Sequence, residues 1–118
     1  MVWCGRAGGG EVNDNVGGFC CDMTAMTREE RGRYEILRAK LEAGVISVAE
    51  LADGYGLRLR DRAIAPEELV EWIAFEQKCC PFFTLTASEQ AGSLMLLITG
   101  RAGVKDFIRA EFSAIPFE

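Results

Sequence analysis

The dipeptide Asp53-Gly54 constrains the fold of this 118-residue chain more than any other feature, because it separates two apolar-rich segments. The pair is typical of a two-residue type I′ turn, which requires positive φ and joins antiparallel strands. It predicts strands over 45–51 and 55–60. Apolar side chains occupy alternate positions of the later strand, at Tyr55, Leu57 and Leu59. This alternation indicates a sheet with one buried face, over which helices are expected.

Segments with helical spacing lie on both sides of this hairpin. Thr27 and Glu30 fit a capping box and predict a first helix to about residue 43. The apolar face of that helix is expected to contain Tyr34, Leu37 and Leu41. Pro66 suits the first turn of a second helix, and a third helix is expected over 103–112. Between these two helices, strand-like runs predict another hairpin, over 82–87 and 94–99.

These elements predict an α+β fold with the order helix, hairpin, helix, hairpin, helix. The four strands are expected to form one antiparallel sheet that the helices cover. A length of 118 residues suits a single domain. Residues 1–19 contain two glycine clusters and show no hydrophobic period. We therefore expect a flexible glycine-rich tail over 1–19 and one folded domain over 20–118.

Composition excludes several classes of function. The chain has 13 basic and 18 acidic residues, a net charge of −5, which makes nucleic acid and anionic membranes poor partners. No apolar stretch approaches the roughly 20 residues of a membrane helix, and no apolar signal segment begins the chain, so a cytoplasmic protein is expected. The sequence has no histidine, the commonest general base and metal ligand. Thiols, carboxylates or amines must therefore supply any chemistry, and no organic cofactor is expected.

The adjacent residues Cys79 and Cys80 are the strongest candidates for that chemistry. The five cysteines are an odd number and include two adjacent pairs, unlike the spaced even sets of secreted disulfide proteins. Pro81 disfavours helical geometry at the residue before it, so Cys79 is expected to end the second helix and Cys80 to turn out of it. Two such neighbours cannot easily face one core, and at least one thiol is expected at a surface or cleft.

A metal or metalloid ion is the ligand that this arrangement favours. Glu76 shares the helix face of the cysteine pair, so two thiolates and a carboxylate are offered together. A closed site needs a further ligand, and Cys21, just before the first helix, is the expected third thiol. Three thiolates without imidazole suit mercury, arsenite or cuprous copper, and zinc fits with Glu76 or water as fourth ligand. The predicted function is sequestration, delivery or sensing of such an ion.

Two other interpretations stay open. In the first, the cysteines are the catalytic residues of a thiol-dependent redox or organometal-processing enzyme. Catalysis is less favoured than binding, because the negative end of a helix raises a thiol pKa and Lys78 offsets this only partly. In the second, the chain is a structural or interaction domain, such as a homodimer, whose cysteines are inert core residues and whose Glu76 is a solvated carboxylate.

Four segments resemble a family of small uncharacterised bacterial proteins, namely 21–27, 53–55, 72–83 and 103–107. The match extends over 21–118 and excludes the glycine-rich start. The Cys-Cys-Pro-Phe motif at 79–82 is also similar to the C-terminal extension of some metal-responsive regulators of the mercury-resistance type. The resemblance implies soft-metal handling and carries over Cys21, Glu76, Cys79 and Cys80. No DNA-binding helix-turn-helix precedes the motif here, so a regulator's role is not implied.

Overall fold

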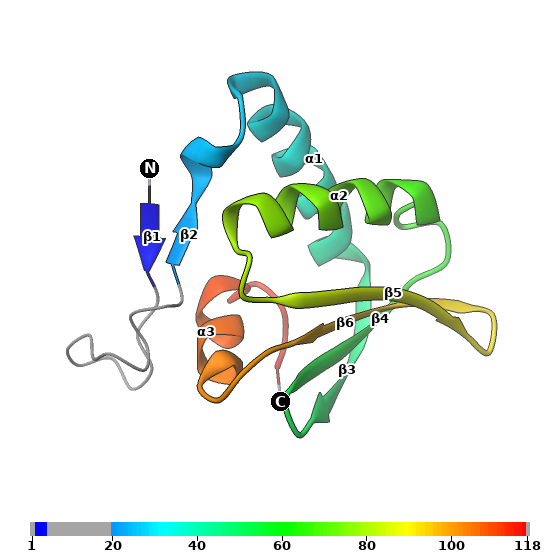
Figure 1. The fold of residues 1–118 in the computed structure, drawn as a ribbon. Coiled ribbons are helices and arrows are strands. Elements are labelled where there is room, and N and C mark those ends of the chain that lie inside the picture. Colours follow the sequence, from blue (N-terminus) through cyan, green and yellow to red (C-terminus); the bar gives the residue numbers. More distant parts are fainter. Residues whose placement is uncertain (1, 5–19, 118) are drawn as a thin grey trace.

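The computed structural model describes the backbone of residues 2–4 and 20–117, and the side chains of Asp22 and of residues 24–117. Within these ranges the chain forms an α+β fold with three α-helices and a four-stranded antiparallel sheet (Figure 1). The predicted tail lies largely outside the described residues. Strand β1, Val2–Cys4, pairs with β2, Cys20–Asp22, and the 3-10 helix η1, Met23–Ala25, follows. These three short elements were not predicted from the sequence.

The four-stranded sheet has the order β3-β4-β6-β5, and all neighbouring strands are antiparallel. Each hairpin supplies one central and one edge strand, and β4 pairs directly with β6. The strands are β3 (Val45–Leu51), β4 (Gly54–Leu59), β5 (Thr84–Gln90) and β6 (Ser93–Thr99). Side chains of the two central strands enter the main core, namely Tyr55, Leu57, Leu59, Leu96 and Ile98.

The turn of the first hairpin differs from the predicted type. The last paired residues are Leu51 and Gly54, so Ala52 and Asp53 form the turn, and neither has positive φ. The type I′ prediction is therefore wrong, although the hairpin itself is present. Glycine is needed at position 54 for a packing reason, because a Cβ there would lie 1.9 Å from the carbonyl oxygen of Ile98.

Positive φ occurs instead in the second hairpin. Its strands extend to Gln90 and Ser93, which pair with each other and shorten the loop to two residues. These residues, Ala91 and Gly92, have φ values of 53° and 80°. Both lie in the left-handed region that primed hairpin turns require. Residues 88–90 and 93, which lie between the two predicted strand runs, therefore belong to the strands.

The first helix begins as predicted. In helix α1, Arg28–Gly44, the backbone N–H of Glu30 donates to the Thr27 hydroxyl at 3.1 Å, and the Thr27 N–H donates to the Glu30 carboxylate at 2.9 Å. This reciprocal pair is the predicted capping box, and it satisfies two backbone donors that the helix leaves unpaired. The buried face of α1 contains Tyr34, Leu37 and Leu41, as expected.

The helices and the sheet share one hydrophobic core. Helices α1 and α2, Pro66–Cys79, lie on the same side of the sheet, and α3, Val104–Glu111, packs near β4 and β6 (Figure 1). Among the described residues, no helix has both the length and the apolar character needed to cross a membrane. The largest fully buried side chains come from all three helices and the sheet, and include Trp72, Phe107, Phe112, Leu37 and Leu96.

Candidate metal centre

Helix α2 ends where the sequence predicted, because a proline follows two residues after its last residue. Cys79 is that last residue. Cys80 leaves the helix with φ −131° and ψ 70°, while its backbone N–H still donates to the carbonyl of Glu76 at 2.7 Å. The chain then turns, and the N–H of Phe83 donates to the Cys80 carbonyl at 3.3 Å. The two cysteines therefore have different backbone geometries at one helix end.

Both cysteines are buried, so the expectation that one reaches a surface or cleft is wrong. Cys79 and Cys80 are each 1% exposed. The turn after α2 directs Cys80 back into the core that Phe83 also enters, and β2 and η1 pack against α2. Burial is also what the inert-packing interpretation requires, so burial alone does not separate a binding site from a structural pair.

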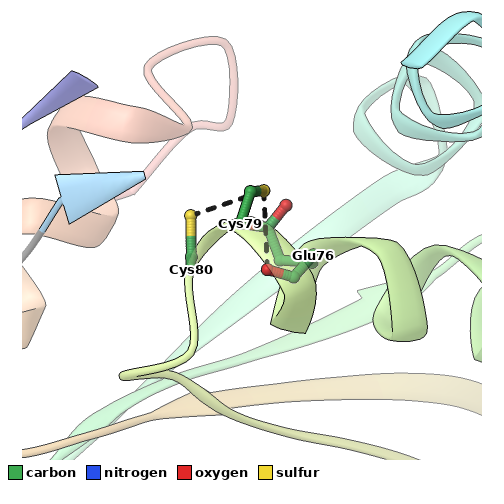
Figure 2. Close-up of side chains that lie close together, drawn as sticks. All are labelled: Glu76, Cys79 and Cys80. Carbon is green, nitrogen blue, oxygen red and sulfur yellow. Dashed lines mark hydrogen bonds between the residues drawn. The ribbon is translucent and has the colours of Figure 1, made fainter. Parts of the chain in front are cut away.

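The three predicted ligands at the end of α2 come together in one cluster (Figure 2). Glu76, Cys79 and Cys80 can each offer one ligand atom, and these atoms lie within 4.8 Å of one another. The two sulfur atoms are 3.8 Å apart, and the Cys79 thiol lies 3.5 Å from the backbone carbonyl oxygen of Glu76. Figure 2 shows the Cys79 sulfur between Cys80 and Glu76. The ligand atoms of the three side chains are therefore close enough together to surround one ion.

The two cysteines differ in chemical state. Cys79 is a free thiol, whereas Cys80 takes part in a disulfide bond whose partner lies outside the described side chains. Thiolates are the form of cysteine that binds metal ions, and a disulfide sulfur is not a thiolate. The cluster can therefore use both sulfur atoms as ligands only after Cys80 is reduced.

Glu76 is a carboxyl group with no exposed surface. Its Oε1 accepts a hydrogen bond from the Tyr34 hydroxyl at 2.6 Å, whereas Oε2 has no hydrogen-bond partner within the described part of the chain. Burial raises the pKa of Glu76 to about 7, although the bond from Tyr34 acts in the opposite direction. A buried polar atom without a partner costs about 1–3 kcal/mol, which a bound cation next to Oε2 would offset.

The residues that hold Glu76 were missed by sequence reasoning. Arg38 donates to the Tyr34 hydroxyl at 3.3 Å and pairs with the carboxylates of Glu111 at 2.7 Å and Glu42 at 2.9 Å. The spacing of Tyr34 predicted only a core position. A weak signal was present, because Tyr34 and Arg38 are four residues apart on one helix and Glu76 is a carboxylate on an apolar stripe. Their contact depends on how two helices pack, which the sequence does not give.

The environment of Cys79 disfavours its thiolate in the absence of a cation. Burial raises the pKa of Cys79 to about 12, and the nearby carboxylates of Glu76 and Glu111 add to this. The direction agrees with the sequence expectation, but burial is the first cause. Lys78 does not act as expected, because its ammonium group pairs with Glu30 at 3.0 Å. At neutral pH the free thiol is a weak nucleophile, and a cation at the cluster would favour the thiolate.

Cys21, the expected third thiol, has a described backbone but no described side chain. It lies in β2, and the backbone of β2 packs against α2. This placement brings the chain segment of Cys21 near the helix that presents the cluster. Its role as a ligand stays a prediction.

Comparisons of the chain with protein-family models, with curated proteins and with solved structures return no match. The resemblance to the cysteine-pair extension of metal-responsive regulators therefore stays a prediction.

Proposed function

We propose that the reduced protein binds one thiophilic metal or metalloid ion at the end of α2. Cys79 and Cys80 supply two thiolates, Glu76 supplies a carboxylate oxygen, and Cys21 supplies a third thiolate. The role of such a site is sequestration, delivery or sensing of the ion. Zinc, mercury, arsenite and cuprous copper are the candidate ions, because each accepts thiolate ligands.

The observation that carries this proposal is the buried carboxyl group of Glu76 beside two sulfur atoms, with no hydrogen-bond partner for its Oε2 among the described residues. Inert packing explains two buried cysteines, since free cysteine behaves as a small apolar residue. It does not explain why a carboxylate with an open hydrogen-bonding position is buried next to them, because buried polar groups are normally satisfied. An ion bound to all three groups explains the burial of the set.

The raised pKa of Cys79 favours binding over catalysis. A thiol enzyme needs a thiolate before its substrate arrives, and burial with the carboxylates of Glu76 and Glu111 raises the pKa of Cys79 more than Arg38 lowers it. A binding site has no such requirement, because the incoming ion itself displaces the proton. The same surroundings that make Cys79 a poor nucleophile are therefore compatible with an ion site.

Native mass spectrometry of the reduced protein, titrated separately with zinc, mercuric and arsenite ions, tests the proposal. We expect one-to-one binding with a dissociation constant below about 1 μM for at least one ion, which corresponds to roughly −8 kcal/mol. Binding should survive in a Cys4→Ser/Cys20→Ser double variant, which leaves the proposed ligands intact. It should be lost in Cys79→Ser, and also in the wild-type protein with the Cys80 disulfide intact.

The opposite results point to the other interpretations. Binding that is unchanged in Cys79→Ser and in Cys80→Ser would contradict the proposed site. No binding of any of the three ions to the reduced protein would favour cysteines that only pack. Circular dichroism of each serine variant shows that a lost site is not caused by an unfolded chain.

A further inference from the structure

A chain of hydrogen bonds links α3 and α1 to the carboxylate of Glu76. Arg38 is held at one end by Glu111, through the carboxylate at 2.7 Å and the backbone carbonyl at 2.5 Å. Its guanidinium also lies 4.7 Å from the ring centroid of Phe112. Arg38 then donates to the Tyr34 hydroxyl, which donates to Glu76 Oε1. Glu76 therefore receives its only described side-chain hydrogen bond from a residue that is itself anchored.

The position of Tyr34 is fixed by packing as well as by hydrogen bonds. Its ring stacks on Trp72, with centroids 6.2 Å apart and an interplanar angle of 13°. Trp72 in turn contacts the edge of Phe112, with centroids 6.1 Å apart. The Tyr34 hydroxyl is thus held in place at Oε1, and Oε2 has no hydrogen-bond partner among the described residues. Holding Oε1 fixes the carboxylate beside the two sulfur atoms, where it can serve as a ligand for an ion.

The kind of ligand also restricts the ion. The 3.8 Å between the two sulfur atoms belongs to the state with the Cys80 disulfide, so the preference rests on ligand type and not on this spacing. A ligand set that adds a carboxylate oxygen to thiolate sulfur suits a borderline ion such as zinc better than an ion that prefers sulfur alone.

We propose that Tyr34, anchored by Arg38, is a positioning residue that makes Glu76 a ligand and gives the site a preference for a borderline ion of the zinc type. This inference rests on the proposed ion-binding function and specifies its ion class. Groups that orient ligands in this way typically change metal affinity by 10- to 100-fold when they are removed. The preference should therefore depend on the Tyr34 hydroxyl, although that hydroxyl does not contact the ion.

The variant Tyr34→Phe removes the hydroxyl and keeps the ring that stacks on Trp72. With reduced protein, we expect zinc and cobalt(II) affinity to fall 10- to 100-fold, while arsenite affinity changes by less than about 3-fold. The cobalt(II) visible spectrum should shift, because loss of a carboxylate ligand changes the coordination sphere. Glu76→Gln should give the same zinc loss, and the double variant should lose no more than either single one.

The matched control is Arg33→Met, which removes an ion pair with Glu71 between the same two helices and does not touch Glu76. It should leave zinc affinity and the cobalt spectrum unchanged. Zinc affinity within 3-fold of wild type in Tyr34→Phe, or equal losses of zinc and arsenite affinity, would overturn the inference while leaving the proposed function intact. Failure of the reduced wild-type protein to bind any ion would instead overturn the proposed function itself.

Discussion

At the scale of single residues, Glu76 combines features that rarely occur together. It has no exposed surface, one oxygen bonded to Tyr34 and one oxygen without a described partner. Burying a carboxyl group costs free energy, and the group responds by holding its proton to higher pH. The metal-free protein therefore carries a titratable group in its core whose pKa is near neutrality.

This raised pKa predicts how stability depends on pH. Because Glu76 has a pKa of about 7 in the folded protein and about 4.5 when unfolded, its contribution is fully present below pH 4.5 and is lost as the pH rises through 7. Between pH 5 and 8 we expect the metal-free, reduced wild type to lose about 1–3 kcal/mol relative to Glu76→Gln. Urea unfolding of both proteins at the two pH values measures this difference. Parallel changes in both proteins would contradict it.

The site residues predicted from the sequence differ in part from those that the structure brings together. The sequence identified Glu76, Cys79 and Cys80, because helical spacing and a following proline are local features. It did not identify Tyr34 and Arg38 as their supports, because those contacts require the packing of α1 against α2. It also placed one thiol of the pair at the surface, whereas the turn after Cys80 returns both to the core.

At the scale of elements, the hairpins show which parts of the fold are encoded locally. The change to an alternating pattern located β3 and β4, and the structure has strands there. The turn type was not predictable from Asp53-Gly54, because the glycine is required by the neighbouring strand β6 rather than by its own φ. The apparent turn signal was thus a signal for close strand packing.

Two glycine substitutions test this distinction. Gly54→Ala places a Cβ 1.9 Å from the Ile98 carbonyl oxygen, so β4 or β6 must shift. We expect a loss of more than about 2 kcal/mol in the free energy of unfolding, as for other overpacked positions. Gly92→Ala has free space around its Cβ and only the cost of φ 80°, about 1 kcal/mol. Urea unfolding should rank the two variants in this order, and the reverse order would refute the packing explanation.

At the scale of the whole molecule, the cluster lies where separate parts of the chain meet. The end of helix α2 and the residue after it carry the proposed ligands, α1 and α3 hold Glu76 through Arg38 and Tyr34, and β2 packs beside α2. An ion bound there would therefore link several elements of one core. Ion binding at this cluster is expected to depend on the oxidation state of Cys80. Both sulfur atoms become available as thiolates only after its disulfide is reduced.

The central claim is that an ion contacts sulfur and carboxylate ligands at the end of α2. X-ray absorption at the zinc edge, on reduced protein loaded with one equivalent of zinc, measures the ligands directly. We predict at least two sulfur neighbours at about 2.3 Å and at least one oxygen at about 2.0–2.2 Å. In Cys79→Ser the sulfur count should fall. A spectrum with no sulfur neighbours, or one that is identical in Cys79→Ser, would contradict the account.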